Sequence, residues 1–415
     1  MNDEFHNLIK KICEKHNIKY NLISNNWVMV LEKNNIKKFV IGYKFDDNNY
    51  AIGKIFDDKY ATYELLNLYN IPVVQHSIVY SLLNKNWYAS KYNNMEYINK
   101  LFNKYNKDIV IKKNTGSGGK NVKRFSDLNE LEKYYKNIKS NNSYSITPFY
   151  EIENEYRTIV LNNQIKLMYK KELPIVYGDG KSKIEDLLKK FNYEYFKDIK
   201  DERILEKNEK YVFGWKFNLG QGSRVNFEIE ENDKNEILKI LNKILNNFKI
   251  GFCSIDIIKT NNKFMVLEIN SGVMMTNLMK ENNGKNIAYK IYEEEILNMF
   301  GERKIMEHRM KLRNKPFEQI KNNKKNIEMR LYDEKRKQIK EKDIIIFTNI
   351  DTNEELKVEV EKLYIFNNFE ELYNYFDKKE LGYLDEEASY KDMEEYYSKE
   401  EQKEYGVVGI RIKKI

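Results

Sequence analysis

The sequence contains little cysteine and histidine. Its two cysteines, Cys13 and Cys253, lie far apart among 415 residues, which excludes a disulfide framework and a zinc-binding cysteine cluster. Its four histidines are equally scattered, so we assign them no role. Isolated cysteines of this kind are typical of a protein in a reducing compartment.

Long apolar runs are also absent. No run approaches the roughly 20 residues that cross a bilayer, and residues 1–12 lack the apolar core of a signal peptide. We therefore expect a cytoplasmic protein without a membrane partner.

The composition is that of a folded chain, with 41% hydrophobic and 33% charged residues. A length of 415 residues exceeds one comfortable core, so we expect two or three folding units. The net charge of +8 is modest but unevenly distributed. Residues 301–340 contain 14 Lys or Arg against 6 Asp or Glu, whereas residues 341–410 contain 8 against 20. This asymmetry indicates a basic and an acidic face near the C-terminus.

Three regions follow from the order of the patterns. Residues 1–56 read as a helix followed by short strands, which predicts a small leading α/β domain. From Asp57 helices and strands alternate, including an expected strand over Ile71–Tyr80, up to a helix that ends near Phe300. A short charged linker follows, and a new strand pattern starts at His308. We therefore predict domains over residues 1–56, 57–301 and 308–415.

A glycine-rich loop follows a buried strand at residues 109–120, which read IVIKKNTGSGGK. Glycines let backbone N–H groups approach phosphate oxygens, and Lys112 at the strand end adds a positive charge. The loop has neither the Walker spacing nor the Rossmann spacing. Taken alone, such a glycine cluster is also typical of an ordinary hairpin turn.

A second motif joins the strands Phe252–Lys259 and Lys263–Ile269. Alternation places Glu268 and Asn270 on one face of a strand, and Asp256 arrives on the neighbouring strand. Two carboxylates and an amide oxygen are ligands that suit Mg²⁺. Acidic residues on a hairpin can equally face solvent, so the motif alone leaves both interpretations open.

Together and in this order, these motifs resemble the ATP-grasp superfamily over roughly residues 57–300. The resemblance extends to segments around Lys59, Tyr156–Arg157, Lys170–Lys171 and Trp215–Arg224. Within this superfamily, the sequence is similar to the branch that contains cyanophycin synthetase, the D-alanine-D-alanine ligases and the glutathione synthetases. It implies an α+β ATP-grasp fold, in which two α+β subdomains clasp ATP, and an enzyme that joins a carboxylate to an amine with ATP and Mg²⁺ or Mn²⁺.

The resemblance also implies roles for individual residues. Catalytic roles fall on Arg157, Lys171, Asn218 and Arg224. Nucleotide binding falls on Lys59, Lys112, Thr115, Gly116, Ser117, Gly118, Gly119, Phe149, Tyr150, Glu151 and Glu155. Metal binding falls on Asp256, Glu268 and Asn270. Pro148 stands where the family often has an acidic residue, so the alignment of the hinge Phe149–Glu151 is open.

The mechanism that the resemblance implies has two steps. The substrate carboxylate attacks the terminal phosphate to give an acyl phosphate and ADP, and an amine then displaces the phosphate. The protein aligns the reactants and neutralises developing charge, so no nucleophilic Ser or Cys is required. Small-molecule or peptide carboxylates and amines are the expected partners, and a homo-oligomer is compatible with the sequence.

Residues 308–415 resemble an ASCH domain, a small β-barrel of the PUA-like group. The family pattern G-x-K-x-x-E-x-R corresponds here to residues 323–330, NKKNIEMR, where Asn323 replaces Gly. Asn is the residue that best tolerates the left-handed turn that Gly would supply. The resemblance implies binding of RNA or a nucleoside, with Lys325, Glu328 and Arg330 in a shared pocket; a solvated charged hairpin is the alternative.

The leading hypothesis is therefore an ATP-dependent ligase whose C-terminal domain recognises RNA or a nucleoside. One alternative is a nucleotide-regulated protein that binds RNA or a nucleoside. Another is an amide hydrolase in the ASCH domain, since some relatives of that family hydrolyse an acylated cytidine.

Overall fold

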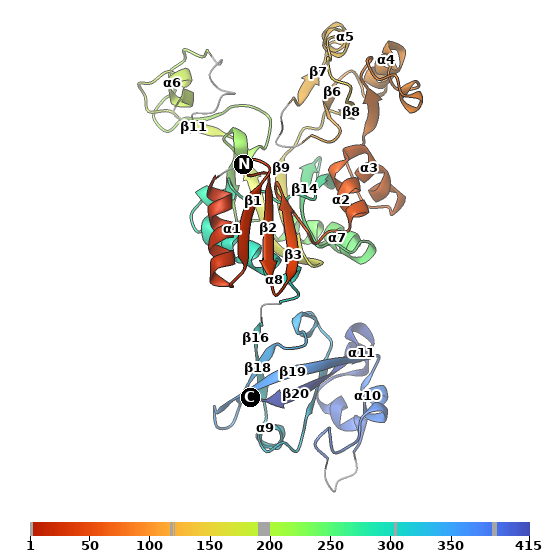
Figure 1. Ribbon diagram of the computed structural model, residues 1–415, viewed down its shortest axis with the longest axis vertical. Coiled ribbons are helices and arrows are strands. Elements are labelled where there is room, and N and C mark those ends of the chain that lie inside the picture. Colours follow the sequence, from red (N-terminus) through yellow and green to blue (C-terminus); the bar gives the residue numbers. More distant parts are fainter. Residues whose placement is uncertain (1–2, 117–118, 120, 190–199, 303–304, 384–387) are drawn as a thin grey trace. The chain divides into compact units, whose positions relative to one another are not determined.

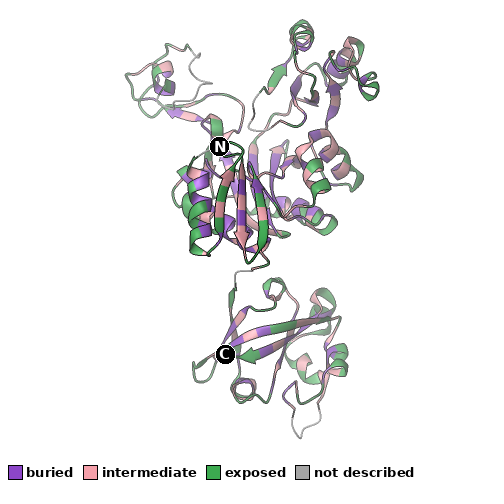
Figure 2. Cartoon of the chain, in the orientation of Figure 1, coloured by how far each residue is buried: buried purple, intermediate pink, exposed green. Residues whose placement is uncertain are grey.

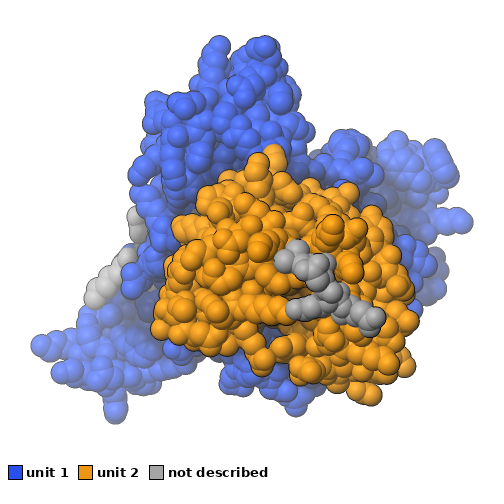
Figure 3. All heavy atoms as spheres, turned by 90° about the horizontal axis from the view of Figure 1, so that it is seen from below, with its two compact units in different colours: residues 1–302 blue, residues 303–415 orange. Residues whose placement is uncertain are grey.

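The computed structural model divides the chain into two compact units, Met1–Glu302 and Arg303–Ile415, which Figure 3 distinguishes by colour. The residues that the structure describes are 3–116, 119, 121–189, 200–302, 305–383 and 388–415. Among these residues, no helix combines the length and the apolar character that crossing a membrane requires. Each unit has its own hydrophobic core, so each is described by itself.

The first unit starts with a helix and a four-stranded antiparallel sheet in the order β1-β2-β3-β4 (Figure 1). The elements are α1 (Asp3–Lys15), β1 (Lys19–Ile23), β2 (Val28–Lys33), β3 (Ile36–Ile41) and β4 (Lys44–Phe45). Apolar residues of α1 recur at helical spacing and are buried, among them Phe5, Ile9 and Ile12. They share one core with Met29 and Val40 of the sheet and with the last helix of the unit, α8 (Gly284–Met299).

A second sheet in this unit has the strand order β5-β8-β6-β7. Its elements and flanking helices are α2 (Tyr50–Asp57), α3 (Lys59–Leu68), β5 (Ser77–Tyr80), η1 (Trp87–Ala89), α4 (Met95–Lys104), β6 (Ile109–Lys113), β7 (Lys123–Phe125), α5 (Leu128–Lys136) and β8 (Ser143–Pro148). Helices α4 and α5 bury Leu101, Phe102 and Leu131 against Ile109 and Ile111 of β6. The core of this layer therefore supports the strand that carries Lys112.

The expected strand over Ile71–Tyr80 is wrong in its first half, since β5 begins only at Ser77. The earlier segment pairs elsewhere. Val73 forms an isolated parallel bridge with Val266, and the Pro72 carbonyl accepts a hydrogen bond from the Val266 backbone at 2.9 Å. Pro72 has no N–H with which to extend a ladder, and the segment crosses to a different sheet.

The third sheet has five strands in the order β13-β10-β9-β14-β15. The remaining elements of the unit are β9 (Asn154–Leu161), β10 (Gln164–Glu172), β11 (Ile175–Tyr177), α6 (Ile184–Lys189), β12 (Lys210–Val212), η3 (Leu219–Gln221), β13 (Arg224–Asn226), α7 (Glu231–Asn247), β14 (Phe252–Thr260), β15 (Lys263–Asn270) and η4 (Leu278–Lys280). Strand alternation sends Ile159 and Phe252 to the core that α8 shares and Val160 and Cys253 to the core under α7. Both faces of this sheet are covered, which fixes its register.

The second unit contains a five-stranded sheet in the order β16-β18-β19-β20-β17, in which only the β16 and β18 pair is parallel among the described strands. Its elements are β16 (Glu307–Leu312), α9 (Asn314–Lys321), β17 (Ile327–Leu331), η5 (Arg336–Gln338), β18 (Ile344–Asn349), β19 (Glu355–Phe366), α10 (Phe369–Tyr375), η6 (Tyr390–Glu395), α11 (Lys399–Tyr405) and β20 (Val407–Lys414). The Arg330 side chain on β17 donates to the Lys311 carbonyl on β16 at 3.1 Å. The two edge strands thus approach each other, and the sheet is a curled half-barrel.

The predicted α+β fold class is confirmed. Asn323, which replaces a family glycine, has φ 56° as predicted, and the turn at Asn261–Asn262 has positive φ at both residues, as a tight hairpin requires. Residues 1–56 contribute to the core of the first unit.

Candidate active site

A cavity of about 1360 Å³ lies within the first unit. It is lined by residues of the three larger sheets of this unit. The lining includes most of the predicted site residues: Lys59, Lys112, Thr115, Gly116, Gly119, Phe149, Tyr150, Glu155, Arg157, Lys171, Asn218, Asp256, Glu268 and Asn270. Segments far apart in the sequence therefore meet at one concave surface. Cavities that combine apolar walls with convergent charged groups are the usual binding sites of proteins.

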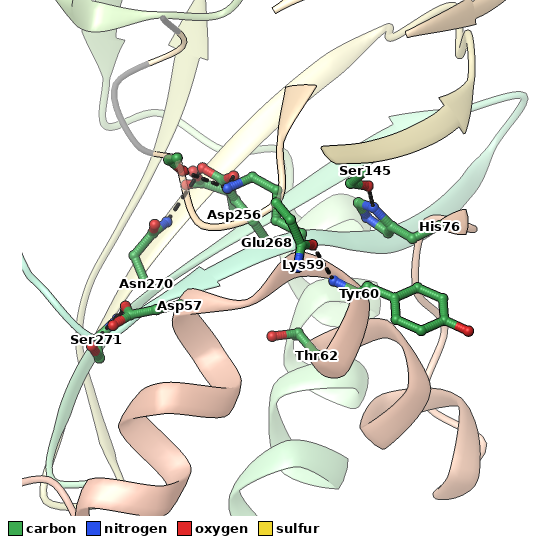
Figure 4. Close-up of polar contacts among 12 residues, drawn as sticks. Asp57, Lys59, Tyr60, Thr62, His76, Ser145, Asp256, Glu268, Asn270 and Ser271 are labelled. Atoms are coloured by element: carbon green, nitrogen blue, oxygen red, sulfur yellow. Dashed lines mark hydrogen bonds and ion pairs between the residues drawn. The ribbon is translucent and has the colours of Figure 1, made fainter. Parts of the chain in front are cut away.

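The predicted metal-binding residues share one face of β14 and β15. Asp256 lies directly opposite Glu268 in the antiparallel register, and Asn270 lies opposite Ser254. The Asn270 amide donates to Glu268 Oε1 at 3.3 Å (Figure 4). No three His, Cys, Asp or Glu side chains group as metal ligands within the described residues.

Asp256 is held by two cations from the neighbouring strands. Arg157 on β9 donates to both of its carboxylate oxygens, from Nε at 2.7 Å and from Nη2 at 2.6 Å. Lys171 Nζ on β10 lies 3.2 Å from Asp256 Oδ2 and also pairs with Glu155. Burial opposes the ionisation of Asp256, but Arg157 and Lys171 hold its pKa below the ordinary value.

The pKa of Glu155 is shifted in the opposite direction from that of Asp256. Burial raises the pKa of Glu155 to about 7, although Lys171 lowers it. A carboxyl group poised near neutral pH can either accept or donate a hydrogen bond. Its predicted contact with ribose hydroxyls is therefore chemically possible beside the Lys171 pair.

Lys59 and Lys112 face Glu268 from the other side of the cavity. Lys59 starts α3, where its Nζ donates to the Gly116 carbonyl at 2.6 Å and lies 3.4 Å from Glu268 Oε2. Burial lowers the pKa of Lys112 to about 8, although Glu268 raises it. Burial also acts on Glu268, but Lys59 and Lys112 lower the pKa of this carboxyl to about 2. The two lysines therefore present positive charge in a desolvated place, where an anionic ligand gains most.

The glycine loop approaches Asn218, which precedes η3. Gly119 has φ +67°, and a Cβ at this position would collide with the Asn218 side-chain amide. Only glycine permits both the conformation and the close approach. Thr115 and Gly116 also line the cavity, whereas Ser117 and Gly118 lie outside the described residues.

The predicted hinge runs from β8 to β9. Phe149 packs edge-on against Trp215 at 5.6 Å and under the Arg124 guanidinium at 3.5 Å from the ring centroid. Phe149, Tyr150 and Trp215 line the cavity. Glu151, in contrast, is exposed and is not part of the lining.

Arg224 is the other predicted residue that the structure does not bring to the cavity. It is exposed on β13, opposite Glu172 of β10. Its neighbour Val225 lies opposite Lys171, but Arg224 itself is not part of the cavity lining.

Sequence reasoning missed a second set of polar contacts at this site. Ser271 Oγ donates to Asp57 Oδ1 at 2.8 Å (Figure 4). Asp57 also pairs with Lys44 of β4. These contacts tie the residue after Asn270 to α2 and to the leading sheet. No motif marks them, because each of the three residues is an ordinary surface type in its own segment.

His76 is a further buried group beside the lysines. Its Nδ1 lies within hydrogen-bonding distance of Ser145 Oγ. Burial, followed by the charges of Lys112 and Lys59, lowers the pKa of His76 well below its ordinary value. A neutral imidazole there adds no third positive charge beside the two lysines.

The second unit holds the predicted group of Lys325, Glu328 and Arg330 together. Glu328 lies 3.2 Å from Lys325 Nζ and 2.8 Å from Arg330 Nη2, and Lys325 and Glu328 are buried. In a separate cavity of about 490 Å³ in this unit, half of the lining residues are Lys or Arg. Its charged lining residues are Glu307, Arg309, Lys311, Arg330, Lys335 and Arg336. Of the predicted group, only Arg330 reaches this cavity.

Comparison with solved structures finds several ligases. The chain is similar to a bifunctional glutathione synthetase from Pasteurella multocida, with 15% identity and a TM-score of 0.40, over 69% of this chain and 43% of that one. It therefore spans less than half the length of that protein. It is also similar to a D-alanine-D-alanine ligase from Bacillus anthracis, with 14% identity and a TM-score of 0.38, over 60% of this chain and 67% of that one.

A third solved structure matches a shorter part of the chain at higher sequence identity. The hypothetical protein PH0355 is 38% identical, with a TM-score of 0.24, over 26% of this chain and 100% of its own length. No curated protein matches the chain. Residues 310–415 match the family model of the ASCH domain, which confirms the resemblance expected for this segment. The second unit of the chain therefore contains an ASCH domain.

Proposed function

We propose that the first unit is an ATP-grasp ligase that joins a carboxylate to an amine through an acyl phosphate. One observation carries the proposal. Lys59, Lys112 and Lys171 converge with Asp256 and Glu268 in a single large cavity. Buried cations beside oxygen ligands are the arrangement that binding and transfer of a phosphoryl group require.

The nucleotide has a consistent place in this cavity. Lys59, Lys112 and the glycine loop would contact phosphates, and the aromatic pair of Phe149 and Trp215 offers a face for the adenine ring. The low pKa of Lys112 reflects a buried charge that lacks full compensation, and bound phosphate would supply it.

The donor set beside the lysines fits Mg²⁺ or Mn²⁺. Asp256 and Glu268 are both held ionised by neighbouring cations, and Asn270 adds an amide oxygen on the same face. Hard divalent ions prefer such oxygen donors. When bound, the ion would neutralise charge on the phosphates.

The balanced reaction has two steps. A carboxylate oxygen attacks the γ-phosphorus of ATP, the bond to the β-phosphate oxygen breaks, and ADP leaves. An amine then attacks the acyl carbon, releases inorganic phosphate and loses a proton, which leaves an amide. Arg157 and Lys171 line the same cavity and would stabilise charge on the transferred phosphoryl group.

Calorimetric titration with ATP tests the nucleotide site directly. We expect binding in the presence of Mg²⁺, and binding weakened about tenfold to a hundredfold in Lys112→Met, because a charge-assisted contact is lost. Lys243→Met is the matched control, since Lys243 is exposed on α7. Equal affinity in both variants would remove Lys112 from the site.

A second function is favoured by the cationic cavity of the ASCH domain. Among the described residues, the charged lining consists of Glu307 and five cations, Arg309, Lys311, Arg330, Lys335 and Arg336. Arg309 and Arg336 are paired with Glu355 and Asp333. Such a concentration of positive charge suits the phosphates of RNA or of a nucleotide. We propose that this unit binds RNA through the cavity.

Fluorescence polarisation with a single-stranded RNA of mixed sequence and the full chain tests this binding. Affinity should fall with salt concentration, and Lys311→Ala with Lys335→Ala should reduce the salt slope by about one for each lost phosphate contact. Lys413→Ala is the control, because Lys413 is exposed and outside the cavity lining. An RNA affinity that changes neither with salt concentration nor in these variants would exclude the cavity as an RNA site.

A further inference from the structure

We infer that one substrate of the proposed ligase carries an aromatic or bulky aliphatic group, which binds to an apolar wall formed by Trp27, Phe39 and Ile41. The inference rests on the proposed function and specifies the class of its substrate. All three side chains line the same cavity as Lys112, Asp256 and Glu268. Phe39 and Ile41 belong to β3 of the leading sheet and Trp27 to the turn just before β2, a region in which the sequence motifs show no chemistry.

The leading sheet is apolar on its inner face and at one end of its outer face. Met29, Leu31 and Val40 are buried in the core of the unit. On the opposite face the register pairs Phe39 with Val30 and Ile41 with Val28. Half-buried residues alternate with buried ones along the first part of β2 (Figure 2), and on β3 the exposed Phe39 and Ile41 flank the buried Val40. The solvated face of an antiparallel sheet normally carries polar residues. Here only one end of that face does so, with Glu32 opposite Lys37, whereas the end with Phe39 and Ile41 is apolar.

The apolar wall is exposed where it lines the cavity. Trp27 is 55% exposed, Ile41 48% and Phe39 44%. Contiguous exposed apolar surface of this kind marks binding sites on soluble proteins. Single exposed apolar residues are common, but here three neighbours face one cavity.

Trp27 is held in place by its own turn. The Gly42 backbone donates to the Trp27 carbonyl at 3.1 Å. Gly42 has φ +63°, and a Cβ at Gly42 would lie 2.9 Å from the indole ring. Glycine therefore lets the ring lie against the backbone, which fixes an exposed indole before any ligand arrives.

The wall is continuous with the reacting centre. The segment after Gly42 leads through Tyr43 to Lys44, which pairs with Asp57 beside Ser271. Ser271 directly follows Asn270, and Tyr43 accepts a backbone hydrogen bond from Val273 at 3.0 Å. A substrate can thus place its apolar group on Trp27 while its reacting carboxylate or amine reaches the charged end.

The nucleotide does not account for this wall. Adenine already has an aromatic contact available in Phe149 and Trp215, which come from the hinge and from the segment before η3. The lysines and the glycine loop account for the phosphates. A second group of aromatic and aliphatic side chains in the same cavity is therefore assigned to the other substrate.

A panel of amino acids and dipeptides tests the assignment, with release of ADP from Mg²⁺-ATP as the readout. Members with Phe, Trp, Leu or Ile side chains should stimulate release, and charged members should not. In Trp27→Ala the KM for the active members should rise about tenfold or more, while kcat and the calorimetric affinity for ATP stay nearly constant. Trp27→Phe, which retains a ring, should recover most of the affinity.

Trp87→Ala is the matched control, since Trp87 is 86% exposed and not part of the cavity lining. Stimulation by charged members alone, an unchanged KM in Trp27→Ala, or no response of the whole panel in release or in Trp27 fluorescence would overturn the inference. A change only in self-association of Trp27→Ala by ultracentrifugation would also overturn it, in favour of an interface between copies. A chain that does not bind ATP would instead contradict the proposed ligase.

Discussion

Two buried charge clusters, one in each unit, are built around a glutamate on a β-strand. Glu268 lies in the strand segment Leu267–Asn270, between Lys59 and Lys112. Glu328 lies in the similar segment Ile327–Arg330, between Lys325 and Arg330. Each segment alternates apolar and polar residues, and each glutamate has two cationic neighbours.

The clusters differ in what surrounds them. Glu268 lines a cavity of about 1360 Å³ together with lysines from other segments. Glu328 does not line the cavity of its unit, and both of its cationic partners come from the same short stretch of chain. A short sequence pattern is therefore enough to predict an ion pair such as that of Glu328. A binding site such as the one around Glu268 also requires charged residues from segments that are distant in the sequence.

The largest expected effect separates the two glutamates by activity. Glu268→Gln should reduce ADP release about a thousandfold, or ~4 kcal/mol, because a metal ligand and a charge beside the phosphates are lost. Glu328→Gln is the matched variant and should leave ADP release unchanged. Similar rates of ADP release in the two variants would show that the two glutamates do not differ in their role in the reaction.

The next effect concerns stability. Asp256→Asn leaves Arg157 and Lys171 without their carboxylate, so it should destabilise the first unit by about 3 kcal/mol in denaturant unfolding. Asp108→Asn removes the same bidentate geometry, since Arg124 bonds Asp108 at 2.9 and 2.7 Å on the surface. That control should stay within about 1 kcal/mol, and an equal loss in both variants would show that burial of the Asp256 pair is unimportant.

A pH profile sharpens the comparison further. The pKa of Lys112 is lowered to about 8, so the lysine loses its charge as the pH rises through 8. ATP affinity should then fall by up to about tenfold per pH unit above 8. Lys112→Arg keeps its charge throughout this range, and its profile should be flat there. A sloping profile in both proteins would assign the titration to another group.

The same lysine also affects folding. Its folded pKa lies below that of the unfolded chain, so burial of the charged form costs stability at low pH. This cost is relieved as the pH rises from 8 towards 10.5. Glu268 instead stabilises the fold near neutral pH, since its pKa is lowered to about 2, and this stability is lost as the pH falls from 4.5 towards 2. For both groups stability rises with pH, in different pH ranges.

The smallest effect lies at the turn before the second cluster. Asn323 has φ 56°, so Asn323→Ala should cost about 1 kcal/mol and Asn323→Gly close to nothing. Denaturant unfolding of the second unit measures both. Equal losses in the two variants would mean that contacts of the side chain, rather than its backbone conformation, explain the asparagine.

Much of the site follows from strand alternation in the sequence. The opposition of Asp256 and Glu268 was predicted from the hairpin spacing, and the register shows it. The clamp of Arg157 and Lys171 on Asp256 could not be predicted, because it depends on how β9 and β10 pair with β14. The apolar wall could not be predicted either, because Trp27, Phe39 and Ile41 are residue types that are common in any strand.

One correction has a similar origin. The strand expected from Ile71 was wrong because Pro72 and Val73 meet Val266 in another sheet. Pairing between remote segments decides where Val73 lies, and no local pattern in the sequence reports it. The role of Arg224 stays a prediction, since this residue lies on the edge strand β13 and outside the cavity lining.

Identification of the nucleotide product tests the central proposal most directly. The full chain, Mg²⁺-ATP and the panel of amino acids and dipeptides are incubated, and the products are separated by anion-exchange chromatography. The active substrate that supplies the reacting carboxylate is then labelled with ¹⁸O in that carboxylate, which shows where the label goes. The proposal predicts ADP and one ¹⁸O atom in the released phosphate. Release of AMP, or phosphate without label, would contradict an acyl-phosphate ligase.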